Sequence, residues 1–273
     1  MNPRVPVGRH RHHGQTLVVT LEESSDPALY GRSFADVYDQ WYVHSFDTES
    51  AITALLHLAA DGPILELGVG TGRLALPLAQ RGLRVVGLDS SGDMLHQLGE
   101  RDAQGNVIAV LGDMSDVETV IRSVGSDEQF SLVFCAFNTL LNLAGLDEIT
   151  RCLRGSRELV GPNGRVVIEA FVPIEFSSIG RTSLSPARVR SDAAVFIETD
   201  FDEETGRLRG RHIEVERDSV TVRPWSVFVC GPEQIDSAAH SAGLVLIDRW
   251  SDWVGGEFTE DSPTHVSIYA PIE

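Results

Sequence analysis

The chain has 273 residues, 42% of them hydrophobic, which suffices for one large α/β domain with an insertion or for two small domains, and no apolar run approaches the ~20 residues of a membrane span. The net charge of −18 argues against nucleic-acid substrates, and because no signal-peptide pattern is present we expect a cytoplasmic protein that binds neither nucleic acid nor a membrane. The absence of lysine excludes Schiff-base chemistry, and three widely spaced cysteines without a CxxC pair support neither a zinc site nor a disulfide framework.

The N-terminal part of the chain divides into an arm and an aromatic segment. Residues 1–24 are rich in Pro, Arg and His at their start, and we expect a flexible arm that could order against a second copy of the chain in a homodimer. Ser25-Asp26-Pro27 is a helix-start signal. The following aromatic residues have the spacing that lines one helical face: Tyr30, Phe34, Tyr38 and Trp41. Such a stripe is typical of a core, and a lid over a ligand is the alternative.

A strand, a glycine-rich turn and a helix follow the helix expected over residues 48–60. The apolar run Ile64–Leu67 predicts a strand that is buried on both faces. Gly68, Gly70 and Gly72 come next at alternate positions, and residues 74–79 begin a helix. This order is typical of a nucleotide-binding crevice at the end of a parallel strand, where glycine allows a ligand to approach the backbone.

The residues around the glycines indicate which nucleotide is bound. The spacing is G-x-G-x-G, and Arg73 stands where a dinucleotide fingerprint has its last glycine. Glu66 would repel a pyrophosphate, yet a carboxylate there suits a cationic ligand. Asp89 ends the next apolar run, 21 positions after Gly68, which is the distance expected for a carboxylate on ribose hydroxyls. A third buried strand over residues 107–111 ends in Gly112-Asp113-Met114.

The rest of the chain predicts two more parallel strands and then a change of pattern. Strands are expected over 130–138 and 165–171, separated by a helix over 147–160 and by the turn Gly161-Pro162-Asn163-Gly164. Alternating apolar and polar residues then predict three antiparallel strands with one wet face, at 195–201, 207–216 and 220–229. A helix over 232–242 and strands over 244–250 and 265–270 complete a seven-stranded sheet.

The ordered set E-x-G-x-G-x-G, acidic end of the second strand and Gly112-Asp113-Met114 resembles the class I S-adenosylmethionine (SAM)-dependent methyltransferases over about residues 30–168. The resemblance implies an α/β fold: a Rossmann-like seven-stranded, mostly parallel sheet with an antiparallel β lid inserted after the fifth strand. It implies a SAM-binding core over 25–172 and 231–273, and a lid or substrate-binding insertion over 173–230, which could also mediate the homodimer. SAM would be the cofactor and S-adenosylhomocysteine the product.

The resemblance also implies which residues form the site. Tyr38, in a Tyr-Asp sequence, would close over SAM; Met94 would lie against the adenine, with a core methionine as the alternative; Asp113 would accept the adenine amino group, with a helix cap as the alternative. The expected cofactor contacts are Tyr30, Tyr38, Glu66, Gly68, Val69, Gly70, Arg73, Asp89, Ser90, Met94, Asp113, Met114 and Phe137. The expected substrate contacts are Tyr42, Asn138, Asn142, Phe171 and Trp225.

Methyl transfer from a sulfonium mainly requires orientation of the nucleophile, so an amine acceptor needs neither a metal nor a dedicated base. The candidate bases are His44, Glu169 and His212. The Tyr-Asp sequence, Gly112-Asp113-Met114 and the antiparallel strands after the fifth strand look most like the N-methyltransferases of natural-product pathways, such as those that act on amino sugars. The resemblance therefore implies a SAM-dependent methyltransferase acting on a small molecule or short peptide, with N-methylation in natural-product biosynthesis as the leading hypothesis. The alternatives are O-methylation of a hydroxyl or carboxylate, methylation of a peptide N-terminus, and a non-catalytic SAM-binding protein. A nicotinamide-dependent oxidoreductase is disfavoured by the missing third fingerprint glycine.

Overall fold

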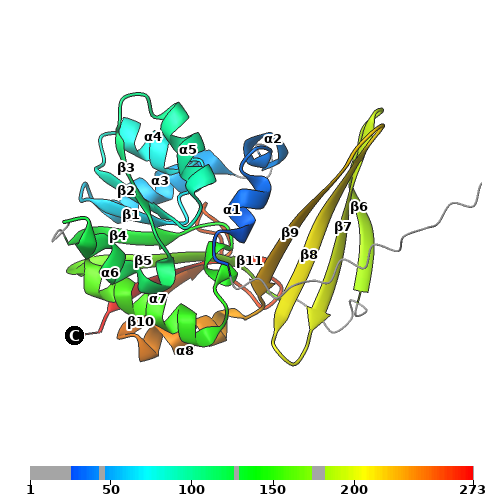
Figure 1. Ribbon diagram of the computed structural model, residues 1–273. Helices are drawn as coiled ribbons and strands as arrows, with labels where there is room; N and C mark the ends of the chain where they lie inside the picture. The colour runs from blue at the N-terminus through cyan, green and yellow to red at the C-terminus, as the bar shows by residue number, and fades with distance from the viewer. Residues whose placement is uncertain (1–25, 43–46, 126–128, 174–181, 273) are drawn as a thin grey trace, which may run out of the picture.

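The computed structural model describes residues 26–42, 47–125, 129–173 and 182–272 (Figure 1). The expected arm of residues 1–24, Ser25 of the helix-start signal and the candidate base His44 lie outside the described residues. Among the residues described, no helix is both long enough and apolar enough to cross a membrane.

The larger of two sheets has seven strands and lies between two layers of helices (Figure 1). Its strands lie in the order β10-β11-β5-β4-β1-β2-β3, and β11 is antiparallel to both of its neighbours while the other adjacent pairs are parallel. The predicted mostly parallel sheet is therefore confirmed. The strands are β1 Ile64–Leu67, β2 Val85–Asp89, β3 Val107–Leu111, β4 Phe130–Cys135, β5 Val160–Phe171, β10 Leu244–Trp250 and β11 Thr264–Pro271.

Helices cover both faces of this sheet and bury two separate apolar clusters. One face carries α3 Thr48–Ala59, α4 Ala75–Gln80 and α5 Gly92–Arg101. The other carries α6 Val117–Ser123, α7 Leu146–Leu159 and α8 Pro232–Ser241. Because both faces of the central strands are covered, strands such as β1 consist of buried residues throughout, as their continuous apolar runs predict.

Three details of the prediction are wrong. The third strand is not fully buried: β3 lies at the edge of the sheet, where Ile108 is 42% and Leu111 62% exposed. The aromatic segment forms two short helices, α1 Leu29–Phe34 and α2 Tyr38–Tyr42, with a turn between them. The expected turn at 161–164 belongs to β5 as an irregularity, since Phe130 pairs with Val160 but Leu132 pairs with Arg165.

A second, four-stranded antiparallel sheet arises from the chain between β5 and α8 (Figure 1). Its strands, in sheet order, are β6 Thr182–Val189, β7 Ala193–Asp202, β8 Arg207–Glu216 and β9 Val220–Phe228. The three alternating strands of the prediction are confirmed, whereas β6 was not predicted. Pro186 interrupts its pattern, and proline is tolerated there because β6 is an edge strand.

Arg223 of β9 fastens this small sheet to the N-terminal helices. Its guanidinium donates to the backbone oxygen of Ser33 at 2.6 Å and to both carboxylate oxygens of Asp36 at 2.7 and 2.9 Å. It also lies 5.6 Å from the centre of the Trp41 ring. Planar, bidentate guanidinium–carboxylate pairing of this kind gives orientation as well as energy.

Replacing Arg223 by Ala should therefore lower the free energy of unfolding by about 1–3 kcal/mol, because three hydrogen bonds of a largely buried charge are lost. The measurement is urea unfolding followed by circular dichroism. Arg211→Ala is the matched control: Arg211 pairs with Glu198 at 2.7 Å within the small sheet, and removal of such a pair should cost less than about 1 kcal/mol. Equal losses in the two variants would contradict a special role for Arg223 in docking the sheet.

Candidate active site

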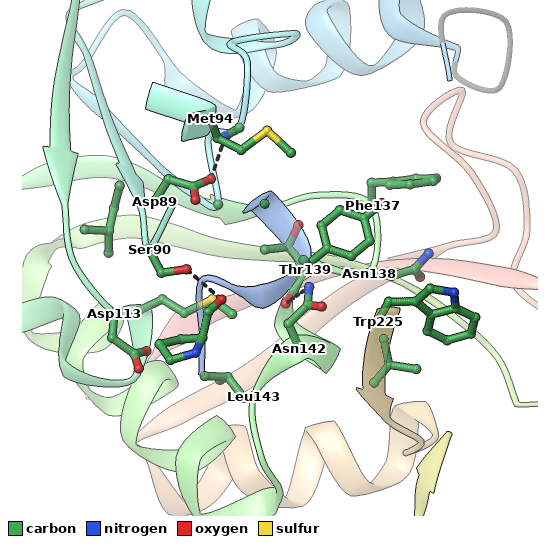
Figure 2. A pocket seen from close by; sticks show the side chains of 18 of the residues that line it. Asp89, Ser90, Met94, Asp113, Phe137, Asn138, Thr139, Asn142, Leu143 and Trp225 are labelled. Atoms are coloured by element: carbon green, nitrogen blue, oxygen red, sulfur yellow. Dashed lines mark hydrogen bonds between the residues drawn. The ribbon is translucent and has the colours of Figure 1, made fainter. Parts of the chain in front are cut away.

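A cavity of about 330 Å³ lies at the carboxyl ends of the parallel strands, between the large sheet, α1 and the small sheet. Figure 2 shows its side chains converging from these elements. The loops after β1, β2, β3 and β4 supply most of the wall, and β8 and β9 supply Leu208, Trp225 and Val227. The small sheet thus forms part of the cavity wall.

The glycine turn after β1 exposes its backbone to this cavity. Gly68 and Gly70 have φ values of +72° and +55°, which favour glycine, and a Cβ on Gly68 would collide with the Thr139 side chain. The Gly68 N–H donates to the Leu88 carbonyl at 2.8 Å. Thr71 in the same turn donates from its hydroxyl to Asp39 at 2.8 Å, so the Asp of the Tyr-Asp sequence ties α2 to the glycine turn.

Asp89 at the end of β2 joins two of the loops around the cavity. Its Oδ2 accepts the Gly70 N–H at 2.8 Å, and its Oδ1 accepts the Ser91 N–H at 2.8 Å. Burial raises the pKa of Asp89, while these two backbone N–H groups act in the opposite direction. One carboxylate therefore fixes both the glycine turn and the start of α5, and it still lines the cavity.

The outer wall combines structural and cavity-facing roles. Ser90 donates to the Pro27 carbonyl at 2.8 Å and so connects α5 with the segment before α1. Ser91, rather than Ser90, caps α5 by accepting the Met94 N–H at 3.3 Å. Met94 is buried in the aromatic cluster and also lines the cavity. Asp113 accepts the Ser115 N–H at 2.8 Å as the cap of a short 3₁₀ turn and lines the cavity as well. The structural role of each of these two residues is therefore present, and their contact with adenine stays a prediction.

The turn after β4 places two side chains at the cavity in an unusual backbone conformation. Phe137 and Asn138 have φ values of +49° and +62°, which are uncommon for residues with a Cβ. Hydrogen bonds hold them: the Phe137 N–H donates to the Glu169 carboxylate at 2.7 Å, and the Phe171 N–H donates to Asn138 Oδ1 at 2.7 Å. Strain maintained in this way is typical of functional sites, and both residues line the cavity (Figure 2).

A second cavity, which we call the aromatic chamber, adjoins the first and shares Tyr30 and Trp225 with it. Its volume is also about 330 Å³. It lies between α1, α2 and the small sheet and is lined by Tyr30, Trp41, Tyr42, Ala187, Arg188, Ile197, His212 and Trp225.

His212 in this chamber is a neutral hydrogen-bond donor. Its Nδ1 accepts the indole N–H of Trp225 at 3.1 Å, which assigns the ring proton to Nε2. Burial, together with the charges of Arg188 and Arg223, lowers the pKa of His212 to about 4. The lone pair of the ring is therefore engaged by Trp225, which argues against His212 as a general base.

Comparison with known proteins identifies the fold. Residues 64–164 match a family model described as a methyltransferase domain. The chain is 32% identical to the CcbJ methyltransferase from Streptomyces caelestis, whose structure it matches with a TM-score of 0.82 over 91% of this chain and 100% of that one. The chain belongs to the methyltransferase family. The cofactor of this family is SAM, and the resemblance that the sequence motifs indicate is confirmed.

Two further relatives extend the comparison. The present chain is 31% identical to the cypemycin N-terminal methyltransferase of a Streptomyces species. The matched segment covers 57% of the present chain and 62% of the length of that curated relative. Its fold also matches SAM-bound CalS10, an amino pentose methyltransferase from Micromonospora echinaspora, with a TM-score of 0.63 and 18% identity over 86% of this chain and 96% of that one.

Most of the site residues expected from the sequence line the first cavity of this methyltransferase. They are Tyr30, Tyr38, Gly68, Gly70, Asp89, Ser90, Met94, Asp113, Met114 and Phe137 of the cofactor set, and Asn138, Asn142, Phe171 and Trp225 of the substrate set. Tyr42 and His212 line the aromatic chamber instead.

Three expected cofactor residues do not line the first cavity. Glu66 is 4% exposed, and burial raises its pKa to about 8, with the charge of Arg73 acting in the opposite direction. Val69 packs in the core, where a Cβ on Gly87 would come within 2.6 Å of it. Arg73 lines a smaller neighbouring cavity of about 270 Å³ together with Glu169. Their contact with the cofactor stays a prediction.

Several cavity-lining residues were not predicted: Pro27, Gly31, Leu88, Gly112, Thr139, Leu143, Leu208 and Val227. Gly112 could have been predicted from the sequence, because it directly precedes Asp113, which was expected to contact the cofactor. Gly31 could not, because its position depends on tertiary packing: α1 approaches the start of α5 so closely that a Cβ on Gly31 would collide with Ser91. Leu208 and Val227 lie in strands that were predicted, but alternation does not indicate which face covers a cavity.

We expect Asp89→Ala to weaken binding of S-adenosylhomocysteine about 10- to 150-fold, corresponding to ~1.5–3 kcal/mol for a lost charged acceptor and a loosened glycine turn. Calorimetric titration measures the change. Asp93→Ala, which removes an exposed carboxylate from the first turn of α5, is the control and should bind normally. Unchanged affinity in Asp89→Ala would contradict the position assigned to Asp89.

Substitutions at Glu169 separate a positioning role from a catalytic base. Gln keeps an oxygen that accepts the Phe137 N–H, so Glu169→Gln should retain methyl transfer close to wild type. Ala leaves the strained turn without its acceptor, so Glu169→Ala should lose about 1–3 kcal/mol of unfolding free energy and most of its activity. The measurements are urea unfolding and turnover of the methylated product. An inactive Glu169→Gln enzyme with native stability would identify Glu169 as a base instead.

Proposed function

We propose that this protein transfers a methyl group from SAM to the amine nitrogen of a small molecule or short peptide in natural-product biosynthesis. The observation that carries the proposal is the adjacency of the two cavities: the Asp89 and glycine-turn cavity and the aromatic chamber under the small sheet share Tyr30 and Trp225 in their walls. A cofactor site and an acceptor site that share walls are the arrangement that direct methyl transfer requires.

The described residues fit SAM in the first cavity. SAM supplies an activated methyl group on a sulfonium cation. We assign its ribose to Asp89, its adenine to Asp113 and Met94, and its amino-acid portion to the backbone of Gly68 and Gly70, where no Cβ blocks approach. Tyr38 would close the cavity from α2, and the small sheet would act as the lid.

The state of the two candidate bases that the structure describes, His212 and Glu169, favours nitrogen over oxygen as the methyl acceptor. His212 has its lone pair engaged by Trp225, and the Glu169 carboxylate accepts the Phe137 N–H. A hydroxyl must lose its proton during transfer and benefits from a base, whereas an amine that arrives deprotonated is already nucleophilic. The chain's own residues would then orient the amine and exclude water, which can supply as much as ~7–11 kcal/mol of the barrier.

The relatives support the same acceptor class. The cypemycin enzyme is described as an N-terminal methyltransferase, and CalS10 as an amino pentose methyltransferase. A peptide N-terminus and an amino sugar are both amines carried by natural products, and we propose an acceptor of this chemical class for the present chain.

The test is product analysis with SAM and paired acceptors, in which each amino sugar or short peptide is matched by its hydroxyl analogue. We expect a mass increase of one methylene on the amine compounds only, and a product that resists mild alkaline hydrolysis, as an N-methyl group does and a methyl ester does not. S-adenosylhomocysteine binding without any methylated product would instead favour a non-catalytic SAM-binding protein.

The pH dependence provides a further prediction. Because the pKa of His212 is lowered to about 4, this residue stays neutral above pH 5 and should add no inflection between pH 5 and 8. At low acceptor concentration the rate should rise about tenfold per pH unit until the acceptor amine is deprotonated. Initial rates between pH 6 and 10 measure this, and a bell-shaped profile with a limb near pH 6–7 would indicate a base.

A further inference from the structure

Among the described residues, the wall of the aromatic chamber contains a positive charge and no acidic side chain. Its lining residues are aromatic, aliphatic or neutral apart from Arg188 of β6. This is unusual in a chain with a net charge of −18, where carboxylates outnumber arginines. A charge that is kept in a cavity without a counterion indicates a ligand that brings one.

Arg188 is held in place by Trp41 and Tyr42. It donates a hydrogen bond to the backbone oxygen of Trp41, and its guanidinium carbon lies 5.3 Å from the centre of the Trp41 ring and 6.0 Å from that of Tyr42. Stacking on aromatic rings fixes a guanidinium without consuming its N–H groups. A guanidinium has five N–H donors, so Arg188 keeps donors for a further acceptor.

The neighbouring arginines of the small sheet differ from Arg188 in their partners. Arg190 pairs with Glu214 at 3.3 Å, Arg211 with Glu198 at 2.7 Å, and Arg223 with Asp36 at 2.7 Å. No carboxylate among the described residues lies within ion-pair distance of Arg188. Arg223 also contacts the Trp41 ring, but its charge is already compensated.

A second donor belongs to the same chamber. Since Trp225 engages Nδ1 of His212, the other ring nitrogen carries the proton and can donate. The charge of Arg188 also acts on both His212 and Tyr42, so the field in the chamber is positive. A cation is disfavoured there despite the aromatic walls, because the rings of Trp41 and Tyr42 already face a guanidinium.

We propose that the aromatic chamber binds the methyl acceptor through an anionic group, a carboxylate or a phosphate, docked on Arg188. The apolar body of the acceptor would pack against Trp41 and Trp225, and its amine would extend past Tyr30 toward the first cavity. The proposal specifies the acceptor class within the function proposed above and depends on it for the role of the amine, but the anion site itself can be tested without methyl transfer.

The experiment uses the full chain saturated with S-adenosylhomocysteine and follows tryptophan fluorescence, because Trp41 and Trp225 line the chamber. The probes are L-phenylalanine, L-phenylalaninamide, which lacks the carboxylate, and phenyl phosphate. We expect at least about tenfold tighter binding of an anionic probe than of the amide, as for a charge-assisted pair. Tighter binding of phenylalanine or of phenyl phosphate then distinguishes a carboxylate from a phosphate.

Variants test whether Arg188 is responsible. Arg188→Gln should lose about tenfold or more in affinity for the anionic probes and none for the amide, and Arg188→Lys should recover part of the loss, because it keeps the charge but not the planar fork. Arg190→Gln, the same change two residues along the chain on an arginine that already has a carboxylate partner, should bind all probes normally. Normal binding of S-adenosylhomocysteine by each variant would verify folding.

Equal binding of acid and amide, equal affinities in wild type and Arg188→Gln, or no binding of any probe to the S-adenosylhomocysteine complex would each overturn the proposal. These results differ from failure of the methyltransferase function, which would be seen as absent methylated product while the dependence of anion binding on Arg188 persisted.

Discussion

The carboxylate of Asp89 and the glycines around it are the constraint on which the site depends. One side chain accepts N–H groups from two loops, at Gly70 and Ser91, so the turn after β1 and the start of α5 cannot move independently. The space beside it exists because side chains are missing: a Cβ on Gly68 would collide with Thr139, and a Cβ on Gly31 with Ser91. At Gly68 the missing side chain opens the backbone to a ligand, and at Gly31 it lets α1 pack directly against the start of α5. Both helices contribute residues to the cavity wall.

The wall formed by the turn after β4 contains strained backbone that hydrogen bonds hold in place. Phe137 and Asn138 adopt left-handed backbone conformations that cost of order 1–3 kcal/mol each. Glu169 and Phe171, from the adjacent strand β5, hold the turn through two bonds of 2.7 Å. Because β4 and β5 are paired parallel strands, this turn is positioned by the central sheet, and the residues that face the cavity are held by hydrogen bonds within the protein.

The sequence predicted those features that depend on local pattern and left open those that depend on neighbours. Apolar runs and glycines determined the strands and the cavity-lining loops, because a doubly covered strand requires buried residues throughout. The exposure of Ile108 follows from the position of β3 at the sheet edge, which its own composition does not encode. The aromatic spacing of α1 and α2 is satisfied equally by one helix or by two packed segments. Arg188 could not be singled out from the sequence, because its difference from the other arginines is that no carboxylate of the described residues lies within ion-pair distance of it, and this depends on the tertiary structure.

The chemistry of the two cavities is mutually consistent. His212 is neutral and its lone pair is bound by Trp225, so this residue of the chamber does not take the proton of the acceptor. On the proposed function, the amine would arrive deprotonated, because an ammonium would meet Arg188 and none of the described residues in the chamber wall is a carboxylate. An acceptor that carries an anionic group and a free amine has a net negative charge, which suits both Arg188 and the sulfonium of SAM. Its protonated form would add a second cation beside the sulfonium. The placement of charge would thus select the reactive form of the acceptor by electrostatics, in place of a general base.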